Sequence, residues 1–191
     1  MTPQRLVVAS QNPDKIREVE EVLETLELPV EIVRGLSWPE VEETEPTLEG
    51  NALLKARAVA AFTGLPAVAD DTGLEVDALG GAPGVYTARY AGPAATYADN
   101  VAKLLTELEG AVDRGARFRT AVALVDPEGS ELVVTGTLEG SIAHRPRGDG
   151  GFGYDPVFVV DDRTLAELPP AEKNLISHRA RALQALAAAI A

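Results

Sequence analysis

Cysteine is absent from the 191-residue chain, and histidine occurs only at His144 and His178. Without cysteine the chain has no disulfide framework, no thiolate nucleophile and no cysteine-based zinc site. His144 has no polar context that suggests a site, so a zinc site or catalytic triad built on histidine gains no support from a second histidine. Any catalytic or metal-binding site of this chain is therefore expected to use carboxylates, amides and cations.

Long apolar runs are also absent, since no stretch approaches the roughly 18 consecutive apolar residues that span a bilayer. The N-terminus enters an apolar segment directly, with no basic region and no cleavage site, so we expect no export signal. The sequence therefore predicts a cytoplasmic protein that does not partner with a membrane.

Basic residues are few: 17 Lys and Arg stand against 30 Asp and Glu, which gives a net charge of −13. Such a surface repels phosphate backbones, so we expect no nucleic-acid partner. A small phosphorylated ligand is compatible with this charge if a local cluster of Lys and Arg binds it, together with a divalent cation held by some of the carboxylates.

The composition that remains is typical of one globular domain, with 46% apolar residues in a chain long enough for one sizeable core. Strand and helix patterns alternate in the first half, and strands cluster between residues 117 and 142. This order predicts an α/β fold with a mixed sheet. We expect strands near 6–9, 66–69, 118–125, 131–142 and 156–160, and helices near 13–26, 47–63, 97–109 and from 178 onward.

Helix ends are marked by local signals. Asn12 before Pro13 is typical of a cap followed by a first helical position. Thr96 with Asp99 three residues later predicts a capping box, and Gly64 predicts a left-handed residue after the second helix.

A glycine pattern near residue 150 matches the dinucleotide-binding fingerprint, because Gly148, Gly150 and Gly153 have its spacing. That fingerprint needs a strand before the glycines and a helix after them. Pro156 and the strand pattern that follows it exclude such a helix. The same stretch carries Phe152, Tyr154 and Asp155, which suit a nucleobase, although a glycine-rich turn with Phe152 in the core is the alternative.

Acidic residues form one candidate site. Asp70 and Asp71 are expected to end a strand, where ligands of open α/β sheets bind. Adjacent strand residues point to opposite faces, so only one of the two can face a given cleft. The aspartate that faces the cleft could form a carboxylate pair for magnesium with Glu42 or Glu43, and a solvated acidic rim is the alternative.

Cations and amides form a second group of candidates. Ser10, Gln11, Asn12 and Lys15 surround a helix N-terminus, an arrangement that favours a phosphate. Asn51 and Lys55 lie one turn apart on one face of a second helix, and the alternative is that they form only the polar side of an amphipathic helix.

A basic pair of residues begins the last expected helix. His178 and Arg179 lie in its first turn, where a cation is unfavourable for the helix dipole unless it faces an anion.

Together these segments resemble the inosine/xanthosine triphosphate pyrophosphatase family over nearly the whole chain. The resemblance rests on five blocks in family order: SQNPDK, EETEPTLEGNALLKA, ADDTGLEVDALGGAPGVYTARYAG, GGFGYDPVF and EKNLISHRARAL. It implies a single domain over residues 1–191, with two lobes around a long mixed sheet flanked by helices and a central cleft. It also implies hydrolysis of ITP, dITP or XTP to the monophosphate and pyrophosphate, with Mg²⁺ as cofactor, and a homodimer.

The resemblance also assigns roles by position. Asp71 is implied as the general base and as a metal ligand, with Glu42 as the other metal carboxylate. Gly50 stands where the family often has Glu, which removes one possible acidic group near the metal. The implied substrate-binding residues are Ser10, Gln11, Asn12, Lys15, Asn51, Lys55, Thr72, Phe152, Gly153, Tyr154, Asp155, Lys173, His178 and Arg179.

Two other functions stay open at this point. One is a related pyrophosphatase that acts on modified pyrimidine or ordinary nucleotides, and the other is a nucleotide sensor without catalysis. The retained carboxylates at positions 42 and 71 argue against the sensor.

Overall fold

The computed structural model describes residues 4–26 and 28–190. The chain divides into two compact units. Unit 1 comprises Met1–Asp71, Thr120–Gly136 and His178–Ala191, and unit 2 comprises Thr72–Arg119 and Thr137–Ser177. The single domain over residues 1–191 stays a prediction.

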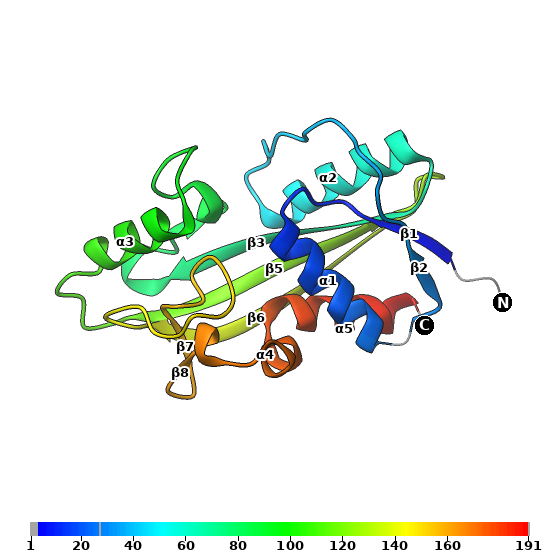
Figure 1. Ribbon diagram of the computed structural model, residues 1–191. Coiled ribbons are helices and arrows are strands. Elements are labelled where there is room, and N and C mark those ends of the chain that lie inside the picture. Colours follow the sequence, from blue (N-terminus) through cyan, green and yellow to red (C-terminus); the bar gives the residue numbers. More distant parts are fainter. Residues whose placement is uncertain (1–3, 27, 191) are drawn as a thin grey trace. The chain divides into compact units, whose positions relative to one another are not determined.

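The strands form a mixed sheet, as the sequence predicts (Figure 1). The order of the eight strands among the described residues is β2-β1-β3-β5-β6-β7-β8, with β4 paired to β3. Strand β1 is parallel to β2 and β3, whereas β3–β4, β6–β7 and β7–β8 are antiparallel. The strands are β1 (Gln4–Val8), β2 (Val30–Ile32), β3 (Ala67–Val76), β4 (Pro83–Gly84), β5 (Gly115–Val125), β6 (Glu131–Ile142), β7 (Phe158–Val160) and β8 (Arg163–Thr164).

Three helix ends lie where local signals predict them. The side chain of Asn12 accepts hydrogen bonds from the backbone N–H groups of Asp14 and Lys15 at the start of α1, and the capping box of Thr96 and Asp99 starts α3. Gly64 adopts φ +65° after α2, as predicted. The α-helices are α1 (Pro13–Thr25), α2 (Leu48–Thr63), α3 (Tyr97–Glu107), α4 (Pro170–Ile176) and α5 (His178–Ile190), and short 3₁₀ turns cover Asp77–Leu79, Thr87–Arg89 and Leu165–Glu167.

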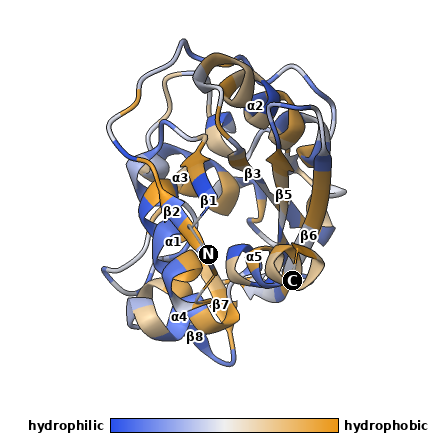
Figure 2. Cartoon of the chain, turned by 90° about the vertical axis from the view of Figure 1, so that its right-hand side faces the viewer, coloured by the Kyte–Doolittle hydropathy of each residue, from blue (hydrophilic) through white to orange (hydrophobic). Residues whose placement is uncertain are grey.

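Each unit has its own apolar core. In unit 1, helices α1 and α5 pack against each other, and Val19, Leu23 and Leu183 join Val8 of β1 in one cluster. In unit 2, the cluster is built around Leu74, Phe118 and Phe158, and the last two rings lie 4.6 Å apart. Figure 2 shows the corresponding hydrophobic colour along much of β3 and β6.

One expectation about the elements is wrong, and one helix was missed. Asp70 and Asp71 do not end a strand but lie inside the ten-residue β3, because buried ion pairs compensate their charges and the strand continues through them. Helix α4 was not expected, and it directly precedes α5. The glycine-rich segment is followed by β7 and not by a helix, which confirms that it is no dinucleotide fingerprint.

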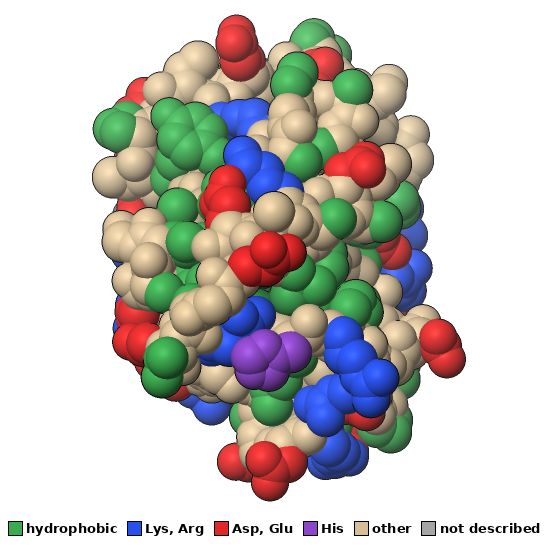
Figure 3. Space-filling model, turned by 90° about the vertical axis from the view of Figure 1, so that its left-hand side faces the viewer, with side chains coloured by type: hydrophobic (Ala, Val, Ile, Leu, Met, Phe, Trp, Pro, Cys, Tyr) green, Lys and Arg blue, Asp and Glu red, His purple; other side chains and the backbone are tan. Residues whose placement is uncertain are grey.

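None of the helices in the described part of the chain has the length and apolar character that crossing a bilayer requires. Acidic and basic side chains both occur on the face drawn in Figure 3, so the charge of −13 is not spread there as one uniform acidic surface.

Candidate active site

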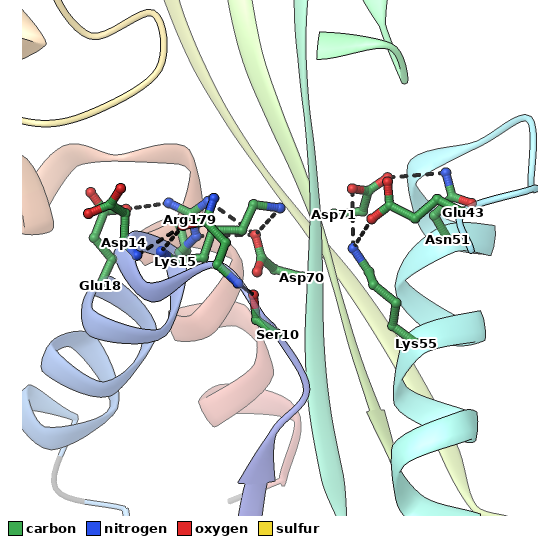
Figure 4. A network of polar contacts seen from close by, with 11 residues as sticks. Ser10, Asp14, Lys15, Glu18, Glu43, Asn51, Lys55, Asp70, Asp71 and Arg179 are labelled. Atoms are coloured by element: carbon green, nitrogen blue, oxygen red, sulfur yellow. Dashed lines mark hydrogen bonds and ion pairs between the residues drawn. The ribbon is translucent and has the colours of Figure 1, made fainter. Parts of the chain in front are cut away.

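Strand β3 sends its two aspartates in opposite directions (Figure 4). Asp70 faces α1 and α5, whereas Asp71 faces α2. This is the alternation of a pleated strand, and it confirms the prediction that only one of the pair can face a given cleft. Both carboxylates are buried, with 4% and 5% of each residue exposed. They therefore form two separate charge clusters, both within unit 1.

Asp71 contacts two residues of α2. Its Oδ2 accepts a hydrogen bond from Asn51 Nδ2 at 3.3 Å, and its Oδ1 lies 3.4 Å from Lys55 Nζ. The same Nζ lies 2.5 Å from Oε1 of Glu43. One ammonium group thus bridges two carboxylates that approach each other from β3 and from the loop before α2.

For both Asp71 and Lys55, burial and the neighbouring opposite charges shift the pKa in opposite directions. Burial raises the pKa of Asp71, although the Lys55 ammonium acts in the other direction. Burial alone would lower the pKa of Lys55, but the nearby Asp71 and Glu43 carboxylates raise it. Asp71 is therefore a carboxylate that accepts a proton more readily than an exposed aspartate, next to a firmly charged lysine.

Asn51 ties the acidic loop to β3. Its side chain is fully buried, and its Oδ1 accepts a hydrogen bond from the backbone N–H of Glu45 at 2.9 Å. Because the same amide donates to Asp71, it holds the loop at a fixed distance from the carboxylate. The sequence indicated that Asn51 and Lys55 share a helical face, and the resemblance implied both as substrate-binding residues, but the contact between Asn51 and the acidic loop was not predicted.

The acid of this loop that lies at Lys55 is Glu43. Glu42, which the resemblance implies as a metal ligand, has an exposed side chain and lines a shallow cavity of about 420 Å³ with Trp38 and Phe62. Its role as a metal ligand stays a prediction, and Glu43 is the alternative that the sequence already left open.

The donor set near Asp71 fits magnesium in type. Among the described residues, no three Asp, Glu or His side chains gather into a ready-made metal cage. Magnesium does not need one, since it binds through one or two carboxylates and completes its shell with water and substrate phosphates. Asp71 and Glu43, already bridged by a cation, are a pair of this kind.

Asp70 forms the second cluster with two cations. Its Oδ2 lies 3.3 Å from Lys15 Nζ and accepts hydrogen bonds from Arg179 Nε and Nη2 at 3.2 and 3.1 Å. The remaining end of the guanidinium, Nη1, donates to Glu18 Oε2. Burial would raise the pKa of Asp70, but Lys15 and Arg179 hold it far below the usual range. Asp70 is thus a permanent anion.

The loop before α1 holds further predicted phosphate ligands. The backbone N–H of Asn12 donates to Ser10 Oγ at 3.2 Å, while the Asn12 side chain is occupied as the helix cap. Gln11 is exposed and donates to the carbonyl oxygen of Trp38 at 3.4 Å. The ammonium of Lys15 is paired with Asp70, and 19% of the Lys15 side chain is exposed.

Unit 2 brings together three of the other predicted residues. Asp155 is buried, and its Oδ2 accepts the backbone N–H of Phe152 at 2.8 Å and lies 2.5 Å from Lys173 Nζ. That ammonium lies 4.8 Å from the centre of the Phe152 ring. Tyr97, which the sequence did not single out, contacts the same ring with a centroid distance of 5.9 Å.

The remaining predicted residues have other surroundings. Tyr154 is buried, and its hydroxyl donates to the carbonyl oxygen of Thr87 at 3.0 Å. Gly153 has φ +62°, which favours glycine at that turn. Thr72 is half-buried in unit 2, and His178 is buried at the start of α5 in unit 1.

Sequence reasoning missed Glu18. A signal was present, because Lys15, Glu18 and Val22 are spaced three and four residues apart and so share one face of α1. An acid on a face that continues into buried valine predicts a buried cationic partner.

Fold and site together define an α/β protein with two buried charge clusters on opposite sides of one strand. The model of the Ham1 family matches residues 6–189. A dITP/XTP pyrophosphatase of Geobacter sulfurreducens is 50% identical over 187 residues, which cover 95% of this chain and 94% of that protein. One of Nocardia farcinica is 49% identical and covers all of this chain and 97% of its own.

Solved structures agree with these sequence matches. A HAM1 protein from Coxiella burnetii has a TM-score of 0.88 and 46% identity, with 98% of each chain covered. A nucleoside-triphosphatase, or dITP/XTP pyrophosphatase, from Mycobacterium abscessus has a TM-score of 0.75 and 49% identity, with 96% of this chain and 97% of that chain covered. The chain belongs to the Ham1 family.

Proposed function

We propose that the protein hydrolyses ITP, dITP and XTP to the nucleoside monophosphate and pyrophosphate. The observation that carries the proposal is the buried Asp71 beside Lys55 and Glu43, in a chain about half identical to dITP/XTP pyrophosphatases over almost all of its length. A carboxylate base in contact with a lysine suits phosphoryl transfer, because this reaction depends mainly on positioning of the reactants and on charge neutralisation.

In the proposed reaction, water attacks the α-phosphorus and the bond to the bridging oxygen of the β-phosphate breaks. Asp71 takes the proton of the attacking water, because its buried carboxylate is the base whose pKa is raised. Lys55 and Lys15 offset negative charge on the phosphates, the Ser10 hydroxyl adds a hydrogen-bond donor, and the dipole at the N-terminus of α1 favours an anion. Pyrophosphate leaves with the electrons of the broken bond.

Magnesium is part of the proposal, with Asp71 and either Glu43 or Glu42 as its protein ligands. When bound, the ion supplies charge neutralisation for the triphosphate and makes a water molecule more acidic. The chain's own residues then act around it: Asn51 keeps the acidic loop beside β3, and Lys55 holds its ammonium between the two carboxylates.

Base selection is proposed to use the 6-oxo group that hypoxanthine and xanthine share. Adenine presents an amino donor at that position, so a donor in the site would face another donor. A polar group left unsatisfied costs about 1–3 kcal/mol, which corresponds to roughly 5- to 150-fold discrimination. The predicted contacts for the base and sugar are Thr72, Phe152 to Asp155 and His178, and Lys173 and Arg179 are predicted for the triphosphate.

The experiment is a substrate panel of ITP, dITP, XTP, ATP, GTP and dUTP with magnesium, in which pyrophosphate and orthophosphate are scored separately. We expect pyrophosphate from the first three, and ¹⁸O from labelled water in the monophosphate. Orthophosphate as the product, or label in pyrophosphate only, would overturn the reaction. Tight binding of ITP without turnover would identify the sensor, and preference for dUTP or ATP would identify the related pyrophosphatase.

Asp71→Asn isolates the proposed base. We expect turnover to fall by about 10²- to 10⁴-fold, with ITP binding largely preserved. The matched control is Asp161→Asn, since Asp161 is an exposed aspartate of unit 2 in a left-handed conformation that asparagine also adopts. Near-normal activity of Asp71→Asn would remove Asp71 from this role. We also propose that the protein acts as a homodimer, which light scattering at micromolar concentration tests.

A further inference from the structure

Phe152, one of the predicted contacts for the base, lies in a segment of unit 2 whose backbone gives its ring little support. The flanking Gly151 and Gly153 adopt φ +68° and +62°. Glycine restricts the backbone less than any other residue, so the orientation of the Phe152 ring depends on the side chains that contact it. A ring that stacks on a purine acts through that orientation, and the neighbours of Phe152 therefore bear on base recognition.

One set of contacts comes from the same loop and from α4. Asp155 Oδ2 accepts the backbone N–H of Phe152 at 2.8 Å and lies 2.5 Å from Lys173 Nζ. The same ammonium lies 4.8 Å from the centre of the Phe152 ring, within the range of a cation–π contact. These contacts join Phe152 to a lysine that is predicted to bind the triphosphate.

Tyr97 contacts the Phe152 ring from a different element, the first turn of α3. The two ring centroids are 5.9 Å apart and the ring planes are tilted by 41°, within the range of favourable aromatic pairs. The backbone at Tyr97 is fixed by the capping box of Thr96 and Asp99, which starts the helix. Helix α3 thus presents an aromatic side chain from a fixed backbone to a ring whose own backbone is rich in glycine.

We infer that Tyr97 is a positioning residue for base recognition, because it holds the Phe152 ring in the orientation in which a purine stacks on it. This inference rests on the proposed function, in which Phe152 contacts the base. Tyr97 carries no charge, so its contribution concerns the base and leaves the binding of the phosphates unchanged. A ring that is oriented before the ligand arrives loses less conformational entropy on binding than a mobile one does.

The experiment compares a ligand that has a base with one that has none. KM for ITP is measured with excess magnesium, together with the inhibition constant of inorganic tripolyphosphate, which has the phosphate chain alone. For Tyr97→Ala we expect KM to rise by roughly 2- to 12-fold, the effect of one aromatic pair, with the inhibition constant at its wild-type value. Tyr97→Phe keeps the ring and should match the wild type in both constants.

Three outcomes for Tyr97→Ala would overturn the inference. An unchanged KM would show that the contact between the rings has no role in binding, and a lower KM would show that Tyr97 covers the stacking surface. An equal rise for ITP and tripolyphosphate would show that Tyr97 acts through Lys173 or through the loop as a whole. Thr106→Ala is the matched control, because Thr106 is an exposed residue of the same helix, and both constants should stay at their wild-type values.

A double variant tests whether the effect passes through Phe152. We expect Tyr97→Ala to raise KM much less in a Phe152→Leu background than in the wild type, because the ring that Tyr97 orients is then missing. An equal factor in both backgrounds would refute the positioning role.

Folding and the proposed function are measured separately. Tyr97 is 42% exposed and alanine is the more favourable residue in a helix, so we expect Tyr97→Ala to fold, which circular dichroism checks. Wild-type turnover reports on the proposed function. If the wild type binds ITP without turnover, the same variants are compared by calorimetric binding of ITP and tripolyphosphate, and if it does not bind ITP, both proposals fall.

Discussion

Gly136 of β6 packs directly against the backbone of α5, the helix that carries His178 and Arg179. A Cβ atom added there would lie 2.2 Å from the carbonyl oxygen of His178 and 2.4 Å from the backbone nitrogen of Ala182. Both atoms belong to the backbone of α5, so no flexible side chain can move aside. Gly136→Ala therefore forces α5 away from β6 by about 1 Å or more, because ordinary contacts begin near 3.4 Å.

The cost has two parts. Overpacking of this kind destabilises a protein by about 1–3 kcal/mol, and contact with backbone on the helix side favours the upper half of that range. For a chain of this size each kcal/mol lowers Tm by about 2–4 °C, so we expect a loss of roughly 4–12 °C. The helix also carries Arg179, so its displacement moves the guanidinium relative to Asp70 and raises KM for ITP.

The assay is thermal unfolding followed by circular dichroism, with ITP kinetics measured well below the transition. Gly64→Ala is the control, since Gly64 has φ +65° and open space around it. That variant should lose stability by backbone strain, without moving α5 and without changing KM. A Gly136→Ala protein with wild-type Tm and KM would refute the packing argument.

Three further predictions concern the Asp71 cluster and the glycine-rich loop that precedes Asp155. Activity should fall as the pH drops through the raised pKa of Asp71, because only the ionised carboxylate accepts a proton. Lys55→Met removes the positive charge that lowers this pKa, so the acidic limb of the kcat/KM profile should move to higher pH. An unmoved limb would contradict this role of Lys55. Removal of magnesium by EDTA should abolish pyrophosphate release, with recovery on adding excess magnesium, and persistent release would exclude a metal requirement. In unit 2, Gly151→Ala places a Cβ atom 2.1 Å from Asp155 Oδ2 at φ +68°. The free energy of unfolding by urea without ITP should therefore fall by about 1–3 kcal/mol, and KM for ITP should rise. An unchanged KM would separate this loop from substrate binding.

Those parts of the fold that depend on neighbouring residues could be predicted from sequence. The cap formed by Asn12, the capping box of Thr96 with Asp99 and the left-handed Gly64 are interactions within a few residues, so their signals are local. The mixed α/β sheet followed from the order of elements, and the family from blocks that run through the chain.

The features that the sequence did not predict correctly depend on residues far apart in the chain. A strand that continues through two aspartates contradicts local propensity, and it is made stable by Arg179, which lies 109 positions from Asp70 in sequence. Glu18 is 161 positions from Arg179, and no local pattern links the two. For the same reason the sequence identified the anomalous cation correctly but could not identify its anions.

The candidate site also shows how one step along a strand can separate two chemical roles. Asp70 faces Lys15 and Arg179, which depress its pKa, so it stays ionised and serves to hold cations. Asp71 faces α2, where burial and the acidic Glu43 outweigh Lys55 and raise its pKa. Two carboxylates whose pKa values are pushed apart by their surroundings mark a division between a fixed charge and a proton acceptor. Because strand alternation produces this division, shifting the register of β3 by one residue would turn each carboxylate to the opposite face, so that Asp70 would point toward α2 and Asp71 toward α1 and α5.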